Sequence, residues 1–152
     1  MKPIIFLDFD GVVNTFYWTR LPSGEWKNSI STDSIVNNLQ AIGWLNELYK
    51  EIPYDVVVTS TWRIGHTTEE LQRILWNSGF NKDIKVIGKT PILHQQRGLE
   101  IQQWIEDNGF HGKFIILDDD SDMGELLPLL VRCDCYIGFG LHEFNKSRRL
   151  LS

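Results

Sequence analysis

Cysteine and long apolar runs are both scarce in this sequence, and each shortage excludes a class of protein. The only cysteines, Cys133 and Cys135, are separated by one residue. This spacing suits neither a disulfide nor a complete metal site, so we expect two small apolar residues of a strand. No apolar run approaches the roughly 20 residues that span a bilayer, and the first residues become acidic at Asp8, too early for a signal peptide. We therefore expect a cytoplasmic protein that does not bind membranes.

Basic residues are outnumbered as well. The chain has 15 Lys and Arg against 20 Asp and Glu, and its net charge is -5. Such a charge is not typical of a protein that coats nucleic acid, although a local basic patch is compatible with it. No repeat, low-complexity tract or long linker divides the 152 residues, and this length is typical of one domain. We therefore predict a single domain over residues 1–152.

Short apolar segments alternate along the chain with segments of helical spacing. The predicted strands are residues 4–7, 55–59, 84–87, 113–117 and 135–137. The predicted helices are residues 33–50, with Thr32 or Asp33 as the N-terminal cap, and residues 67–77, 97–108, 123–130 and 142–151. Strands that are apolar throughout and alternate with helices are typical of a parallel sheet buried on both faces. The predicted fold class is therefore α/β: one Rossmann-like domain with a five-stranded parallel sheet and helices on both faces.

Carboxylates follow two of the predicted strands. Asp8 and Asp10 follow the first strand, and Gly11 then allows a sharp turn. Asp118 and Asp119 follow the fourth strand. Ligands of such sheets bind beyond the carboxyl ends of the strands, so we expect these acids to converge. Buried carboxylates repel one another unless a cation neutralises them, and oxygen ligands suit Mg²⁺. Taken separately, the two clusters are also compatible with a solvated turn and with an acidic loop that caps a helix.

Hydroxyl and basic residues follow other strands of the same predicted sheet. Thr59 and Ser60 end the second strand, where a hydroxyl and backbone N–H groups suit a phosphate oxygen, although a helix cap uses the same residues. The candidate cations for a phosphoryl group are Arg63, Lys89 and Arg97. Taken alone, each of these three side chains is more often a solvated surface charge.

The order of these features resembles that of haloacid dehalogenase-like (HAD) phosphohydrolases. The likeness rests on DFDGV at residues 8–12, VVVT at 56–59, Arg97 at the start of a helix and LDD at 117–119. Further segments are similar to the HAD domain of Swiss Army Knife RNA-repair proteins: DGVVN at 10–14, STWR at 60–63, GKTP at 88–91, RGLEI at 97–101 and DDDSDM at 118–123. The phosphatase half of polynucleotide kinase-phosphatase is a more distant likeness. The resemblance implies a HAD-type phosphomonoester hydrolase that acts on phosphorylated nucleic-acid ends or another large substrate.

The resemblance also implies a role for each acid. Asp8 attacks phosphorus and forms an aspartyl-phosphate, and Asp10 protonates the leaving oxygen and then activates water. Mg²⁺ is held by Asp8, the backbone carbonyl of Asp10 and Asp119. Asp118 belongs to the same metal site, where it orients Arg97 or a metal-bound water.

The same resemblance implies which hydroxyl and basic residues bind the phosphoryl oxygens. Thr59, the backbone of Ser60 and Arg97 bind them, and Arg97 acts as the catalytic cation. Arg63 and Lys89 are further candidates for phosphate binding, and Lys89 is the alternative to Arg97.

No cap domain is expected, although many HAD enzymes carry one after the first or second motif. One predicted helix uses much of the segment between Gly11 and the strand at residue 55, and the segment from Arg63 to Lys89 has room for one short helix. The site should therefore be open. Trp18 and Trp62 could stack on a base, but packing is more typical of such residues.

Other functions remain open from the sequence. A nucleotidase-like phosphatase of small molecules could use the same residues. A receiver-like signalling domain, from another class, needs a phospho-acceptor Asp after a mid-chain strand, where this chain has Thr59. A catalytically inactive binding module would not need both Asp8 and Asp10.

Overall fold

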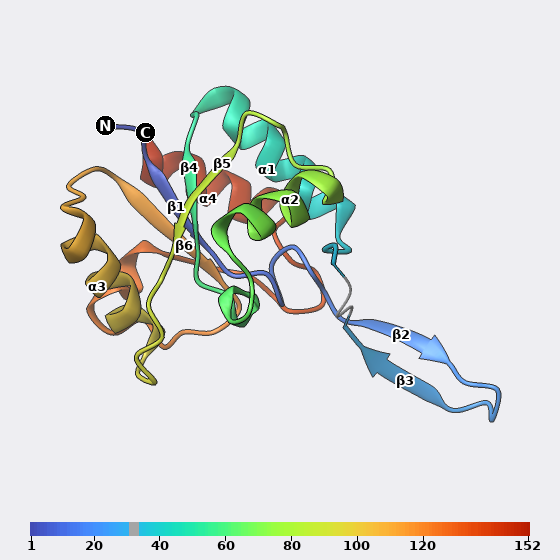
Figure 1. Cartoon of the computed structure of the whole chain (residues 1–152). Helices are drawn as coiled ribbons and strands as arrows, with labels where there is room; N and C mark the ends of the chain where they lie inside the picture. Colours follow the sequence, from blue (N-terminus) through green and yellow to red (C-terminus); the bar gives the residue numbers. More distant parts are fainter. Residues whose placement is uncertain (31–33) are drawn as a thin grey trace.

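The computed structural model describes residues 1–30 and 34–152. It contains a five-stranded sheet with helices on both faces and a separate two-stranded hairpin (Figure 1). The sheet strands are β1 (Ile4–Leu7), β4 (Asp55–Val58), β5 (Lys85–Lys89), β6 (Phe114–Asp118) and β7 (Leu130–Arg132). The hairpin strands are β2 (Tyr17–Arg20) and β3 (Trp26–Ser29). The helices are α1 (Leu39–Glu51), α2 (Thr68–Ser78), α3 (Arg97–Asn108) and α4 (Leu141–Leu151), with two 3₁₀ helices, η1 (Thr61–Arg63) and η2 (Gly124–Leu129).

The N-terminal strand lies in the centre of the sheet, whose strand order is β5-β4-β1-β6-β7. All neighbouring strands of this sheet pair in parallel. Leu7 at the end of β1 lies opposite Val58 of β4 on one side and Leu117 of β6 on the other. The residues that follow these three strands therefore meet at one edge of the sheet.

Alternating side chains of the sheet contribute to two apolar clusters. In β1, Ile5 and Leu7 pack on the face that α1, α2 and α4 cover. Ile4 and Phe6 pack on the opposite face, against α3 and the η2 region. The predicted α/β architecture, with a parallel sheet covered on both faces, is confirmed.

Most predicted elements are confirmed with small shifts at their ends. These are the strands predicted at 4–7, 55–59, 84–87 and 113–117, and the helices predicted at 67–77, 97–108 and 142–151. Helix α2 shows why the sequence predicts helix ends. The Thr67 hydroxyl accepts the N–H of Glu70 at 3.1 Å, and the Glu70 carboxylate accepts the N–H of Thr67 at 3.0 Å. Gly79 ends α2 with a φ of 116°, which favours glycine.

Two predicted helices differ from the structure. Helix α1 begins at Leu39, not at residue 33, because the side chain of Asn38 caps it by accepting the N–H of Ala41 at 3.0 Å. The predicted caps, Thr32 and Asp33, lie outside the described residues. The helix predicted at 123–130 is the 3₁₀ helix η2, which contains Pro128 and therefore lacks one backbone donor.

The strand predicted at residues 135–137 is wrong. The fifth strand is β7, which pairs with β6 earlier in the chain. Residues 135–137 form a turn, and the Asp134 carboxylate stabilises it by accepting the N–H of Tyr136 at 2.8 Å. Cys133 and Cys135 are free cysteines outside the strand.

The β2–β3 hairpin is not predicted by the sequence, because its strands are exposed and lack an apolar face with a period of two. It extends away from the main body (Figure 1). Within residues 1–30 and 34–152 no cap domain covers the sheet, so the expected capless architecture is confirmed. None of the described helices is long and apolar enough to cross a membrane.

Candidate active site

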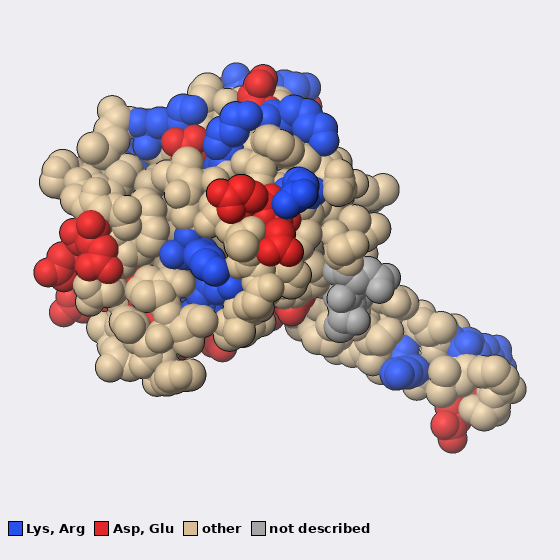
Figure 2. Space-filling model, viewed as in Figure 1, with Lys and Arg blue, Asp and Glu red and all other residues tan. Residues whose placement is uncertain are grey.

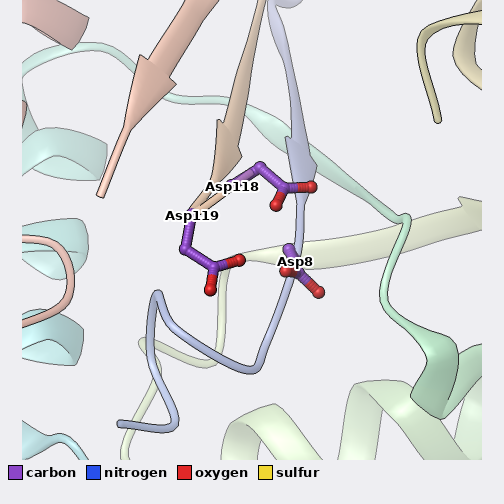
Figure 3. A group of neighbouring side chains, drawn as sticks. All are labelled: Asp8, Asp118 and Asp119. Carbon is purple, nitrogen blue, oxygen red and sulfur yellow. The ribbon is translucent and has the colours of Figure 1, made fainter. Parts of the chain in front are cut away.

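Three carboxylates converge at the carboxyl edge of the central strands (Figure 3). Asp8 follows β1, Asp118 ends β6 and Asp119 comes directly after it. One oxygen atom from each of the three lies within 4.8 Å of the others. The structure therefore brings together the acids that the sequence places after the first and fourth predicted strands.

Arg97 lies against this cluster. It is the first residue of α3, and its Nη1 lies 3.2 Å from Oδ1 of Asp8 and 3.1 Å from Oδ2 of Asp118. Oδ1 of Asp8 also accepts the N–H of Phe9 at 2.9 Å. Oδ1 of Asp118 accepts the N–H of Asp120 at 2.9 Å. These bonds fix both carboxylates relative to the guanidinium.

Gly11 allows the loop after β1 to approach Asp119 closely. Its φ is 86°, and a Cβ at this position would collide with the Asp119 carboxylate. Gly98 plays a comparable part in α3, where a Cβ would collide with the backbone carbonyl of Met123. Both glycines are therefore needed to bring the loops after β1 and β6 and the start of α3 together.

Burial and like charge make the ionised forms of Asp8 and Asp118 costly. Burial raises the pKa of Asp8 above its ordinary value, Arg97 lowers it in part, and Asp119 raises it further. Burial, followed by the charge of Asp8, likewise raises the pKa of Asp118. One guanidinium cannot neutralise three neighbouring carboxylates, so a divalent cation would relieve the remaining repulsion. The donor set, made of oxygen atoms alone, fits Mg²⁺.

The Asp10 side chain has different partners. Its Oδ1 accepts hydrogen bonds from Nδ2 of Asn14 at 2.9 Å and from Nε1 of Trp62 at 3.2 Å. The Trp62 ring in turn packs edge-on against Phe9, with 5.4 Å between the ring centroids. Asp10 is not among the described acids whose side chains group as metal ligands, and its backbone carbonyl stays a predicted ligand. The two donors orient the Asp10 carboxylate separately from the cluster.

Thr59 and Ser60 are both buried after β4. Among the described residues, the Thr59 hydroxyl has no hydrogen-bond partner. Buried hydroxyls normally have a hydrogen-bond partner. A phosphoryl oxygen in the site would be such a partner for Thr59. The Ser60 hydroxyl instead caps η1 by accepting the N–H of Trp62 at 3.2 Å. The Ser60 side chain is thus a helix cap, which the sequence leaves open as an alternative. Phosphate binding by the Ser60 backbone stays a prediction.

Residues 4–144 match the family described as HAD domain in Swiss Army Knife RNA repair proteins. The chain belongs to this HAD family. The predicted resemblance is confirmed, and the match includes Asp8, Asp118 and Arg97. No curated protein and no solved structure matched the chain. Membership of the HAD family supports a phosphohydrolase as the general class of enzyme and argues against the receiver-like alternative.

Arg63 of this HAD domain is buried, and its guanidinium forms hydrogen bonds within the protein. Its side chain is only 4% exposed. The five N–H groups of its guanidinium donate to the carbonyls of Thr59, Ser60, Thr90 and Pro91 and to the carboxylate of Glu100. A guanidinium has no further donor, so this geometry does not favour the predicted contact between Arg63 and a phosphate.

Lys89 lies at the end of β5, an edge strand that β4 separates from β1. Its Nζ donates to the carbonyls of Arg63 at 3.1 Å and His66 at 2.8 Å. Of the three predicted cations, Arg97 is the one that the structure places against Asp8. The geometry therefore favours Arg97 over Lys89 as the catalytic cation of the HAD site.

Three partners of the predicted residues are missed by sequence reasoning. They are Asn14 and Trp62, which hold Asp10, and Glu100, which pairs with Arg63. All three lie within segments that resemble the HAD family, but spacing alone does not show which side chain each of them contacts. The predicted packing of Trp62 is confirmed, since its partly buried ring contacts the core.

Proposed function

We propose that this HAD domain is a magnesium-dependent phosphatase that hydrolyses phosphomonoesters through an aspartyl-phosphate on Asp8. The observation that carries the proposal is the position of Asp8. It lies at the carboxyl edge of an uncapped sheet, bonded to Arg97 and next to Asp118 and Asp119. A carboxylate that is buried beside a cation can approach a phosphate dianion. An acid in a solvated turn would need neither the burial nor the cation.

The proposed reaction has two steps. In the first, the Asp8 carboxylate attacks phosphorus, the bond from phosphorus to the leaving oxygen breaks, and Asp10 gives that oxygen a proton. In the second, Asp10 takes a proton from a water molecule that attacks the phosphorus of the aspartyl-phosphate. Inorganic phosphate leaves, and the Asp8 carboxylate is regenerated. The bonds from Asn14 and Trp62 keep Asp10 oriented in both steps.

Residues at the carboxyl edge of the sheet neutralise the charge on the phosphoryl oxygens. Arg97 neutralises one oxygen while it holds Asp8. The Thr59 hydroxyl, which has no partner within residues 1–30 and 34–152, donates to another. Mg²⁺ bound by Asp8, Asp119 and the Asp10 carbonyl would offset the repulsion between carboxylate and phosphate. Asp118 positions Arg97 for this contact.

Magnesium is expected to raise the melting temperature of the protein, and to raise it less in Asp119→Ala. A ligand bound only by the folded state adds about 2.7 kcal/mol at 100 times its dissociation constant, which corresponds to a shift of several degrees. Thermal melts over a MgCl₂ series measure it. The control is Asp120→Ala, which removes an exposed acid next in the chain. An equal shift in wild type and Asp119→Ala contradicts the assignment, and a loss in Asp120→Ala alone transfers it to Asp120.

The proposed substrate is the phosphorylated end of a polynucleotide. The family match concerns RNA repair proteins, and the described residues include no cap domain over the site. A capped enzyme encloses its substrate and excludes water. An open site must instead gain binding energy from the surface beside the phosphate, which favours a large substrate. A small-molecule phosphatase is the second candidate, because the same acids would serve it.

An oligonucleotide with a terminal phosphate is expected to have a kcat/KM at least about 10-fold above that of the matching mononucleotide, because its flanking nucleotides add binding energy. The advantage should shrink as salt rises, since phosphate contacts release counterions. Strands phosphorylated at the 5′ and at the 3′ end are assayed separately, at low and high salt. Equal or faster turnover of the mononucleotide contradicts the polynucleotide proposal and favours the small-molecule phosphatase.

A further inference from the structure

The β2–β3 hairpin carries two exposed tryptophans on one face. Trp18 is 59% exposed and Trp26 is 61% exposed. The strand register pairs Trp18 with Asn28 and Arg20 with Trp26. Because side chains alternate between the faces of a strand, these four residues share one face. Cζ of Arg20 lies 5.8 Å from the centroid of the Trp26 ring. The Trp18 ring therefore does not pack in the core of the domain but faces solvent.

The hairpin is anchored to the domain near its base by contacts with Tyr136. Asn28 donates to the hydroxyl of Tyr136 at 3.0 Å, and the ring centroid of Phe16 lies 5.9 Å from that of Tyr136. Past this anchor the hairpin extends away from the domain (Figure 1). A two-stranded hairpin has no core of its own, so exposed tryptophans on it indicate a binding surface.

The hairpin follows the loop that carries Asp8 and Asp10. β1 ends at Leu7, Asp8 and Asp10 follow, and β2 starts at Tyr17. Trp18 lies eight residues after Asp10, so their Cα atoms are at most about 30 Å apart. A strand whose end occupies the site can therefore continue to the hairpin.

The composition of the hairpin favours nucleic acid over protein as its partner. Its strands, YWTR and WKNS, contain no Leu, Ile, Val or Met, whereas the core of a protein interface is apolar. Its basic residues, Arg20 and Lys27, outnumber its acidic residue, Glu25, in a chain whose net charge is -5. Figure 2 shows basic side chains along the hairpin and an acidic group near its tip. Aromatic rings beside cations are the arrangement that binds single strands through stacking and phosphate contacts.

We propose that the face formed by Trp18, Arg20 and Trp26 is a stacking platform for unpaired bases of the substrate strand. The two rings stack on bases, and Arg20 contacts a backbone phosphate. The terminal phosphate of the same strand lies at Asp8. The platform rests on the proposed function, since it serves a strand whose end is dephosphorylated there.

Binding of a fluorescein-labelled single-stranded oligonucleotide with a terminal phosphate tests the platform. Fluorescence anisotropy is measured on the Asp8→Asn background, so that the strand is not dephosphorylated. Trp18→Ala and Trp26→Ala are each expected to raise Kd about 10-fold, and Trp18→Phe much less, because a ring remains. The matched control is Tyr17→Ala, since Tyr17 is exposed on the opposite face of the same hairpin. Circular dichroism melts of each variant verify that the domain is folded.

The possible results distinguish a failure of the platform proposal from a failure of the substrate proposal. Kd values that do not change in the two alanine variants, with wild-type turnover still favouring the oligonucleotide, overturn the platform and leave the substrate proposal standing. A wild type that neither binds the oligonucleotide nor prefers it in turnover overturns both. If the alanine variants instead abolish self-association in analytical ultracentrifugation and bind the oligonucleotide normally, the face belongs to a second copy of the chain and the platform is wrong.

Discussion

Asp8→Asn is expected to reduce phosphatase turnover by about 10³-fold or more, because a carboxamide cannot act as the nucleophile. The fold should survive, since asparagine keeps the shape of the side chain and an oxygen that can accept the N–H of Phe9. Steady-state kinetics with a phosphorylated oligonucleotide and a thermal melt of the same preparation measure both effects. The control is Asp83→Asn, an exposed acid between α2 and β5, which should turn over like wild type. Activity of Asp8→Asn above a tenth of wild type would remove Asp8 from the nucleophile role.

The same variant reports on the electrostatics of the metal-free site. The pKa values of Asp8 and Asp118 are raised in the folded protein. Their contribution to stability is therefore full below the ordinary carboxyl pKa and is lost as pH rises through the raised values. Melts in EDTA should show the wild type losing stability over this range and Asp8→Asn losing less, because one of the two carboxyls is absent. Identical pH profiles would contradict the raised pKa values of Asp8 and Asp118.

Arg63→Met is expected to lower the free energy of unfolding by about 3–5 kcal/mol, because it leaves the buried Glu100 carboxylate without its charge partner. The melting temperature should fall by roughly 10 °C. Circular dichroism melts measure the loss. The control is Arg73→Met in α2, where the arginine is exposed and the change should stay within about 0.5 kcal/mol. The double variant Arg63→Met/Glu100→Gln should recover part of the loss, since it removes the uncompensated charge.

This variant also separates two roles for Arg63. If it melts like the wild type while KM for a phosphorylated substrate rises, Arg63 binds phosphate as the sequence predicts. If stability falls and KM of the folded fraction is unchanged, its role is to join the end of β4 to α3. The hydrogen-bond pattern of its guanidinium favours the second result.

The sequence predicts those parts of the site that depend on strand ends, and it misses those that depend on contacts between distant segments. Asp8 and Asp118 follow apolar runs, and parallel strands necessarily bring such residues to one edge. The burial of Arg63 depends instead on Glu100, which lies in another element, and an isolated arginine resembles a surface charge. Trp62, one of the partners of Asp10, is missed for the same reason, because it lies in η1, after a different strand.

The fold is predicted with similar limits. Strands buried on both faces have a strong apolar signal, and α2 and α3 end at Gly79 and Gly109, which adopt left-handed backbone conformations. The exposed hairpin has no such signal. β7 is three residues long and follows directly on the apolar residues of η2, so the pattern does not show where the strand begins. The apolar content of residues 135–137 resembles that of a strand, although these residues form a turn in which Ile137 is exposed.

The central position of β1 has a consequence for how the protein folds. β1 leaves the ribosome before both of its partners, β4 and the much later β6. Until β6 is available, one edge of an entirely apolar strand has no partner, and such an edge is prone to aggregate. Loop closure over this separation also slows folding. Because Asp8 meets Asp118 only through the pairing of β1 with β6, a nascent chain cannot form the carboxylate cluster before β6 has docked. Truncation before residue 114 should therefore yield insoluble protein without phosphatase activity.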